Sequence, residues 1–239
     1  MENKNFLVFG AILGVALVAS AVVVSLTIYN VRALEDTIAV TGSAKERVTS
    51  DTVKWSGMFT RSIPYAQLRS GYASMKQDET IVRTFLTSNG VAEADVKVNP
   101  VMLEDYGKYN PQAPQEYALR QTIEVNSRDV EKVSALAKNL DPVISKGVVF
   151  STQFLEYYYS KLPDLRVSLL SKAVEDAKAR AEKIVETTGR KVGSIQSAAA
   201  GVVQVLPVNS VDISDYGNYD NSSIDKEVMV TVKASFRIK

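Results

Sequence analysis

The chain has 239 residues with a formal net charge of +1, and 46% of its residues are hydrophobic while 23% are charged. This length allows one or two domains with a substantial core, and the balanced charge argues against a nucleic-acid binder or a polybasic membrane patch. The sequence contains neither Cys nor His, which excludes disulfides, thiol nucleophiles, His-dependent base catalysis and the usual zinc sites.

The first element is an uncharged segment, FLVFGAILGVALVASAVVVSLTIY, at residues 6–29. As a helix with a rise of about 1.5 Å per residue it spans roughly 35 Å, enough for a hydrocarbon core of about 30 Å. We predict a transmembrane helix at 6–29, with a short tail at 1–5 and a linker at 30–37. The alternative is a cleaved signal peptide, because Ala19–Ala21 resembles a cleavage site, although signal apolar regions are usually shorter.

Charges near this segment favour one orientation. Lys4 precedes the apolar run, while Arg32 follows it and is offset by Glu35 and Asp36. We expect a short N-terminus inside the cell and the bulk of the chain outside, following the positive-inside rule.

The next segment alternates apolar and polar positions in two runs. Ile38 and Val40 belong to the first, and Val53, Trp55 and Phe59 to the second. This pattern predicts two strands around a turn-rich middle. An amphipathic helix is expected over 65–88 and is closed by a glycine at position 90.

The middle of the chain predicts a strand at 96–103, a loop EDYGKYNPQAPQE at 104–116 and another strand through Val125. A helix is expected at 128–140, with Ser127 as its N-cap. An aromatic-rich strand at 148–159 follows.

The last third contains the clearest helix, at 164–188, with Gly189 as its stop. Its small apolar stripe, which includes Ala173, Ala177 and Ala181, predicts close packing on a sheet. An extended segment at 191–207 and a second loop follow. The closing segment EVMVTVKASFRIK alternates without a break, as an antiparallel strand with one buried face requires.

The two loops share a five-residue pattern, DYGKY at 105–109 and DYGNY at 215–219. Each copy occupies the same place in a strand–helix–strand–loop–strand unit. We predict two related strand-helix-strand-strand halves at about 38–126 and 148–239, joined by the helix at 128–140, within one body at 38–239. The alternative is a chance match of common loop residues.

Two stretches carry a family resemblance. IAVTGSAKERVTSDTVKWSGMF resembles the opening of SIMPL-domain proteins, a family of unknown function, in its V-x-G-x-A core and the Asp before the second strand. LLSKAVEDAKARAEKIVETTGRKVGSI resembles the family's A-x-x-D-A-x-x-[KR]-A stretch. That stretch is carried here by Ala173, Asp176, Ala177, Arg180 and Ala181.

The resemblance covers about 37–239 and implies an α+β fold of antiparallel sheets with packed helices. It also implies an extracytoplasmic bacterial setting, homo-oligomers, and a loose link to envelope or oxidative-stress tolerance. With the predicted helix, this places a single-pass protein in the inner membrane, with a cytoplasmic N-terminus and a periplasmic body. Many relatives instead look secreted, and the family supplies no agreed catalytic residues.

Candidate chemistry is thin. The sequence-adjacent pairs Ser145–Lys146 and Ser171–Lys172 do not predict dyads, since neighbouring helical residues do not face each other. The second loop carries carboxylates that suit Ca²⁺, yet their spacing misses the EF-hand pattern and fits turn formation better. These carboxylates are Asp212, Asp215, Asp220 and Asp225. We expect no enzymatic activity, no cofactor and no metal site.

Tyrosines gather in both loops and the aromatic strand, and they suit interfaces because they combine a large contact area with a polar end. In FLEYYYS, consecutive side chains point to opposite faces, so three tyrosines cannot share one core. The candidate interface or ligand-contact residues are Tyr106, Tyr109, Tyr157, Tyr158, Tyr159, Tyr216 and Tyr219.

The leading hypothesis is a membrane-anchored extracytoplasmic protein that self-assembles, as a ring or barrel, with a structural role in the envelope. Its expected partners are other copies of itself and the bilayer, with no nucleic acid. The alternative is a module that binds an envelope ligand or glycan through the Tyr-rich loops.

Overall fold

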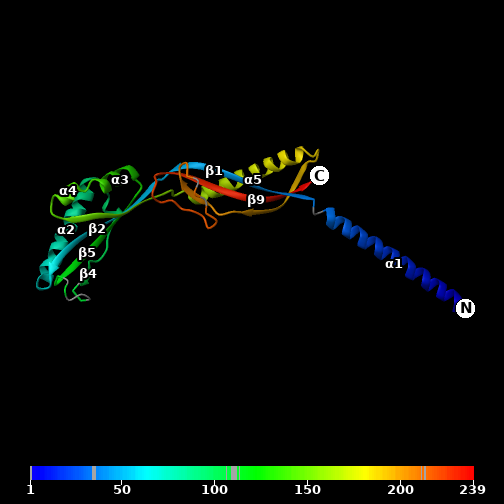
Figure 1. The fold of residues 1–239 in the computed structure, drawn as a ribbon, viewed down its shortest axis with the longest axis horizontal. Helices are drawn as coiled ribbons and strands as arrows, with labels where there is room; N and C mark the ends of the chain where they lie inside the picture. Colours follow the sequence, from blue (N-terminus) through cyan, green and yellow to red (C-terminus); the bar gives the residue numbers. More distant parts are fainter. Residues whose placement is uncertain are drawn as a thin grey trace. The chain divides into compact units, whose positions relative to one another are not determined.

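The computed structural model describes residues 2–33, 36–105, 107–108, 112, 114–210, 212 and 214–239 (Figure 1). The described helices are α1 (Glu2–Ala33), α2 (Leu68–Ser88), α3 (Val130–Lys138), α4 (Asp141–Ile144) and α5 (Leu162–Glu186), with 3-10 turns at Tyr65–Gln67 and Glu93–Asp95. The strands are β1 (Thr37–Thr49), β2 (Thr52–Pro64), β3 (Val96–Val98), β4 (Met102–Asp105), β5 (Glu116–Ser127), β6 (Val149–Tyr158), β7 (Val192–Ala200), β8 (Gln204–Pro207) and β9 (Asp225–Ile238).

The strands form two sheets, whose pairings where given are antiparallel. One has the order β3-β5-β2-β6, with β4 also on β5, and the other the order β1-β9-β7, with β8 also on β9. This confirms the expected α+β fold of antiparallel sheets with packed helices.

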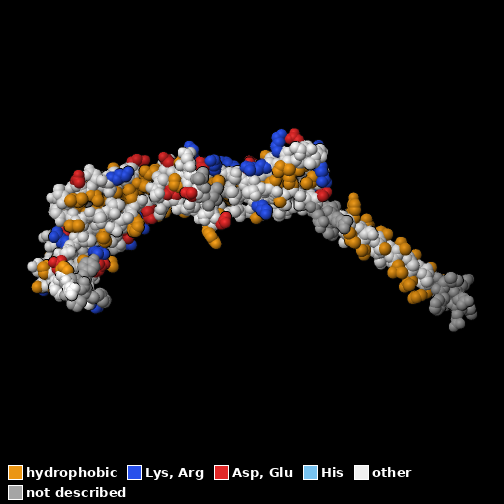
Figure 2. Space-filling view, viewed as in Figure 1, with side chains coloured by type: hydrophobic (Ala, Val, Ile, Leu, Met, Phe, Trp, Pro, Cys, Tyr) orange, Lys and Arg blue, Asp and Glu red, His pale blue; other side chains and the backbone are white. Residues whose placement is uncertain are grey.

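Helix α1 contains an apolar stretch, Val8–Tyr29, that is long enough to cross a membrane and is not buried against protein. Hydrophobic side chains follow its described length (Figure 2). Such a stretch near an N-terminus fits an anchor and also a signal sequence. The helix continues to Ala33, into the segment predicted as a linker.

Backbone contacts divide the chain into two compact units. The first consists of Met1–Ala44, Val167–Val202 and Val230–Lys239, and the second of Lys45–Arg166 and Val203–Met229. In the sheets, β6 pairs with β2, whereas β1 pairs with β9. The proposed relation between the sequence halves at about 38–126 and 148–239 stays a prediction.

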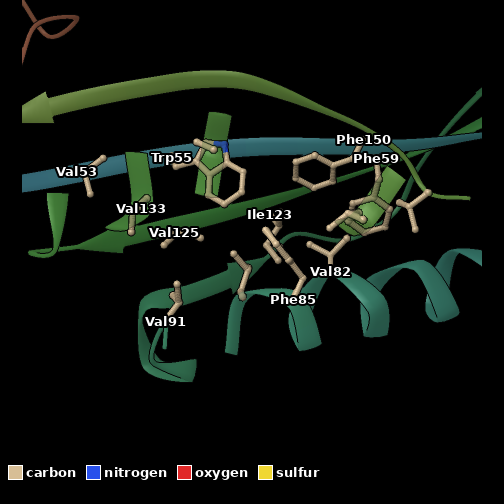
Figure 3. Close-up of a cluster of buried hydrophobic side chains, with 14 of the residues drawn as sticks. Val53, Trp55, Phe59, Val82, Phe85, Val91, Ile123, Val125, Val133 and Phe150 are labelled. Atoms are coloured by element: carbon tan, nitrogen blue, oxygen red, sulfur yellow. The ribbon is translucent and has the colours of Figure 1, made fainter. Parts of the chain in front are cut away.

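The second unit buries the larger hydrophobic core, where α2 and α3 pack on β2 and β5. The alternating apolar positions of β2 place Val53, Trp55 and Phe59 in this core (Figure 3). The Trp55 indole donates a hydrogen bond to Thr152 Oγ1 at 3.1 Å, and its ring meets Phe150 edge to face. Strand periodicity therefore produces the predicted buried face.

The first unit packs α5 on β1 and β9 (Figure 1). The small stripe of α5, including Ala173 and Ala177, contacts apolar residues of both strands, as predicted from the sequence. Gly42 permits this close approach, because a Cβ there would overlap the Ala173 carbonyl oxygen and lie 2.8 Å from Ala177 Cα. Asp176 Oδ2 accepts the backbone N–H of Ser43 at 2.8 Å.

Three local expectations were wrong. The turn-rich middle expected after Val40 is continuous strand, because Gly42 faces α5 rather than a turn. The strand expected at 96–103 is broken around Pro100, which lacks a backbone N–H. The N-cap of α3 is Asp129, which accepts the Lys132 N–H at 3.2 Å, while Ser127 Oγ accepts the Asp129 N–H.

Candidate functional site

The loop between β8 and β9, which contains the second Tyr-Gly-Tyr pattern, is held by a buried glutamine. Gln204 Nε2 donates to the Ser214 carbonyl at 2.6 Å, and Gln204 Oε1 accepts the Asn218 N–H at 2.8 Å. Gly217 has φ +85°, a conformation that favours glycine. The hydrogen bonds of Gln204 therefore hold the described part of the loop in a defined conformation.

A buried ion pair fixes the far end of this loop. The Lys226 side chain is fully buried, and its Nζ lies 2.7 Å from the Asp220 carbonyl oxygen and 3.4 Å from the Asp220 carboxylate. Burial alone would raise the pKa of Asp220, but hydrogen bonds from Ser223 and Ser222, together with the Lys226 charge, hold it well below its usual value. Burial lowers the pKa of Lys226, and Asp220 partly opposes that effect.

Two of the candidate tyrosines lie side by side, Tyr158 on β6 and Tyr219 in this loop. The rings of Tyr158 and Tyr219 have centroids 6.2 Å apart. The Tyr158 hydroxyl donates to Glu156 at 3.0 Å, and Asn221 Nδ2 donates to the same carboxylate at 2.7 Å. Burial, followed by the Glu156 contact, raises the pKa of Tyr158. This polar cluster joins β6 to the loop, since the Tyr157 N–H also bonds the Asn221 carbonyl.

The other candidates are not gathered around the same point. Tyr157 is 4% exposed and its hydroxyl lies 3.0 Å from Ser134 Oγ within the core. Tyr159 is half-buried, whereas Tyr216 is 97% exposed. Tyr106 and Tyr109 lie outside the described residues. A ligand pocket shared by the two Tyr-Gly-Tyr loops therefore stays a prediction.

The first loop is supported by a residue that the sequence reasoning missed. The Tyr65 hydroxyl donates to Asp105, whose carboxylate also accepts the Lys108 N–H at 3.1 Å. The Tyr65 ring lies 4.5 Å from the Tyr117 ring, measured between centroids. Pro64 ends β2 and places Tyr65 at the first position of the following turn, beside the end of β4.

Tyr65 is expected to titrate at unusually high pH, because its hydrogen bond to the Asp105 carboxylate raises its pKa to about 12. Because the folded pKa of Tyr65 lies above the unfolded value of about 10, this contact stabilises the fold fully at pH values below about 10. The stabilisation is lost as pH rises through about 12. Phenolate absorbance of the wild type minus that of Tyr65→Phe isolates this group among the 11 tyrosines.

Asp105→Asn serves as the matched variant, because it keeps the side-chain shape and removes the charge. It should return the Tyr65 step toward its ordinary pKa. If the difference in phenolate absorbance shows that Tyr65 of the wild type titrates at the ordinary tyrosine pKa, the contact with Asp105 is contradicted.

Two acidic residues of the second loop, Asp220 and Asp225, have hydrogen-bond partners in the structure. Asp220 accepts hydrogen bonds from Ser222 and Ser223, and Asp225 accepts one from Thr49 at 2.8 Å. Within the described ranges, no group of three or more His, Cys, Asp or Glu side chains is arranged to hold a metal ion. The Asp220 contacts, with side chains two and three positions later, agree with the turn-forming interpretation of that carboxylate.

A cavity of about 760 Å³ lies at the end of α5 and the start of β7. Part of its charged lining is paired: Lys183 lies 2.7 Å from Glu186 within the lining, and Arg190 bonds Asp36, outside it, at 2.7 Å. None of the candidate tyrosines within the described ranges lines it.

The two buried residues that hold the second loop, Lys226 and Gln204, differ in how clearly the sequence indicates their role. Lys226 continues the buried phase of the alternation in β9, so a lysine two residues before Val228 was a detectable sign of a buried cation. Gln204 carries no such sign, because its loop partners are backbone groups 10 and 14 positions away.

Comparison with known families adds one finding. A family model described as SIMPL, a protein of unknown function (DUF541), matches residues 38–236. The matched range includes the contact of Gly42 and Ser43 with α5. No curated protein matched the sequence.

Proposed function

Because the chain belongs to the SIMPL family, we propose that it is a membrane-anchored envelope protein that acts by self-assembly rather than by catalysis. The body lies outside the cytoplasm and the N-terminus inside, in the inner membrane of a bacterium. The observation that carries this proposal is the 22-residue apolar stretch Val8–Tyr29, joined to a folded α+β body.

Two features support a non-catalytic, self-associating role. The sequence offers neither His nor Cys, and the strongly perturbed groups Asp220 and Lys226 are engaged in holding a loop. Each unit of the body also exposes a large apolar side chain, Phe154 at 63% and Val167 at 67%, that is available for contact with a second copy.

The native chain is expected to stay in the membrane pellet after carbonate extraction and to retain its N-terminal residues. In mild detergent, light scattering should give a protein mass that is a multiple of 26.1 kDa. Recovery of a chain beginning near Ala21 in the aqueous fraction would contradict the anchor, and a monomer at micromolar concentration would contradict self-assembly.

Orientation is tested with single cysteines, since the chain has none of its own. A membrane-impermeant maleimide added to spheroplasts should label Tyr216→Cys but label Lys4→Cys only after lysis. The opposite pattern would reverse the orientation.

A further inference from the structure

Strand β7 is covered on neither face. Its last seven residues, Ser194–Ala200, are all exposed. Since alternate side chains of a strand point to opposite faces, seven consecutive exposed residues mean that both faces meet solvent.

One edge of β7 is also open. Within the described part of the chain β7 pairs only with β9. The Gly201 N–H donates to the Thr231 carbonyl at 2.8 Å, and Ala199 lies opposite Lys233 in the same register. Gly201 and Ala199 are therefore the residues whose backbone groups bond to β9. The alternation of antiparallel ladders then directs the backbone N–H and C=O groups of Ala198 and Ala200 away from β9.

This edge lacks the protection that the edges at β1, β3 and β4 have. Edge strands are usually blunted by charges, Pro, shortness or bulges. On β1, the Ser43 N–H is taken by Asp176, and the strand carries Lys45, Glu46 and Arg47. β3 and β4 are three and four residues long.

By contrast, VGSIQSAAA contains neither charge nor Pro. Its register shifts fall between Val192 and Ser197, which leaves the stretch from Ser197 to Ala200 regular.

The composition of this stretch suits pairing with an identical strand. A strand without charges places no like charges opposite each other when it meets its own copy. A two-fold axis at Ala199 would pair Ala198 with Ala200 of a second copy in both directions, so all of their outward backbone groups are used.

We propose that β7 is the self-assembly surface, where two copies join their β1-β9-β7 sheets edge to edge through antiparallel pairing centred on Ala199. This inference rests on the proposed self-assembly and names its contact. Anchoring in one membrane favours the pairing, because it confines copies to the same surface and raises their effective concentration.

Disulfide trapping in the full-length protein tests the contact. Ala199 would form a non-hydrogen-bonded pair with itself, with Cα atoms about 4.5 Å apart, a distance that a disulfide accepts. Mild oxidation of Ala199→Cys in membranes should convert most of the protein to a disulfide dimer. Mixed Ala198→Cys and Ala200→Cys should cross-link more than either alone.

Ala39→Cys is the matched control, because Ala39 is an exposed alanine on β1, the opposite edge of the same sheet. Trapping of Ala199→Cys no stronger than that of Ala39→Cys, or trapping mainly between positions 39 and 199, would overturn the proposal.

A second variant keeps the test independent of cross-linking. Ala199→Lys places like charges opposite each other and should halve the particle mass in detergent, whereas Ala199→Ser should leave it unchanged. Particles that stay large in Ala199→Lys overturn the β7 contact but leave self-assembly standing. A wild type that is itself monomeric overturns both.

Discussion

Replacing Gly42 by Ala should destabilise the first unit by about 3 kcal/mol, the upper part of the range for overpacked sites. The added Cβ would overlap the Ala173 carbonyl oxygen and lie 2.8 Å from Ala177 Cα. The obstructing atoms belong to the backbone of α5, so no side-chain rotation relieves the overlap and the helix must move. Denaturant unfolding of the full-length protein, followed by circular dichroism, measures the loss.

The matched control is Thr41→Ala, because Thr41 is exposed and precedes Gly42 on β1. Its free energy of unfolding should stay within about 0.5 kcal/mol of the wild type. A Gly42→Ala protein as stable as this control would show that β1 and α5 do not meet as closely as described.

Replacing Lys226 by Met is expected to cost about 3–5 kcal/mol, as for buried ion pairs that lose one partner. Met fills a similar volume but leaves the Asp220 carboxylate, which is 9% exposed, without its cation. The Asp220 carbonyl also loses its 2.7 Å contact with Nζ. Denaturant unfolding should register the loss, and protease should cut the second loop faster.

Two further variants separate this ion pair from general damage to β9. Lys233→Met, at an exposed position of the same strand, should be nearly neutral. The double variant Asp220→Asn with Lys226→Met should recover part of the stability, because it no longer buries an unpaired charge. If the double variant loses the sum of the two single effects, the two side chains do not interact.

The pH dependence of this site follows from the depressed pKa of Asp220. A carboxyl whose folded pKa is lowered contributes stability above its unfolded pKa of about 3.9, and that contribution is lost as pH falls toward the folded value. The acid side of the stability profile should therefore be steeper in the wild type than in Lys226→Met.

Periodic elements were predictable because their burial follows a fixed spacing. The alternation in β9 identified its buried face, and the alanines of α5 identified the stripe that packs on the sheet. The glycines that follow α2 and α5, Gly90 and Gly189, were also predictable as helix stops, and both adopt positive φ. These features depend on local chemistry that one sequence contains.

Features that depend on partners distant in sequence were not predictable. Gly42 looked like a turn residue because only its contact with α5, more than a hundred positions later, explains a glycine inside a strand. β1 pairs with β9 and β6 pairs with β2, so each strand joins the sheet of the other predicted half. No local sequence pattern indicates these pairings. Of the candidate tyrosines that the structure describes, Tyr158 and Tyr219 have their rings in contact, and composition does not specify the geometry that such a cluster requires.

The order of strands β1-β9-β7 has a consequence for biosynthesis. The middle strand of this sheet, β9, follows β1 and β7 in the chain, so the sheet stays incomplete until β9 has been synthesised. Until then, β1 and β7 lack the strand that connects them, although the second unit's central strands β2 and β5 have already been made. Loss of residues from β9 would therefore remove hydrogen-bonding groups from the centre of the sheet.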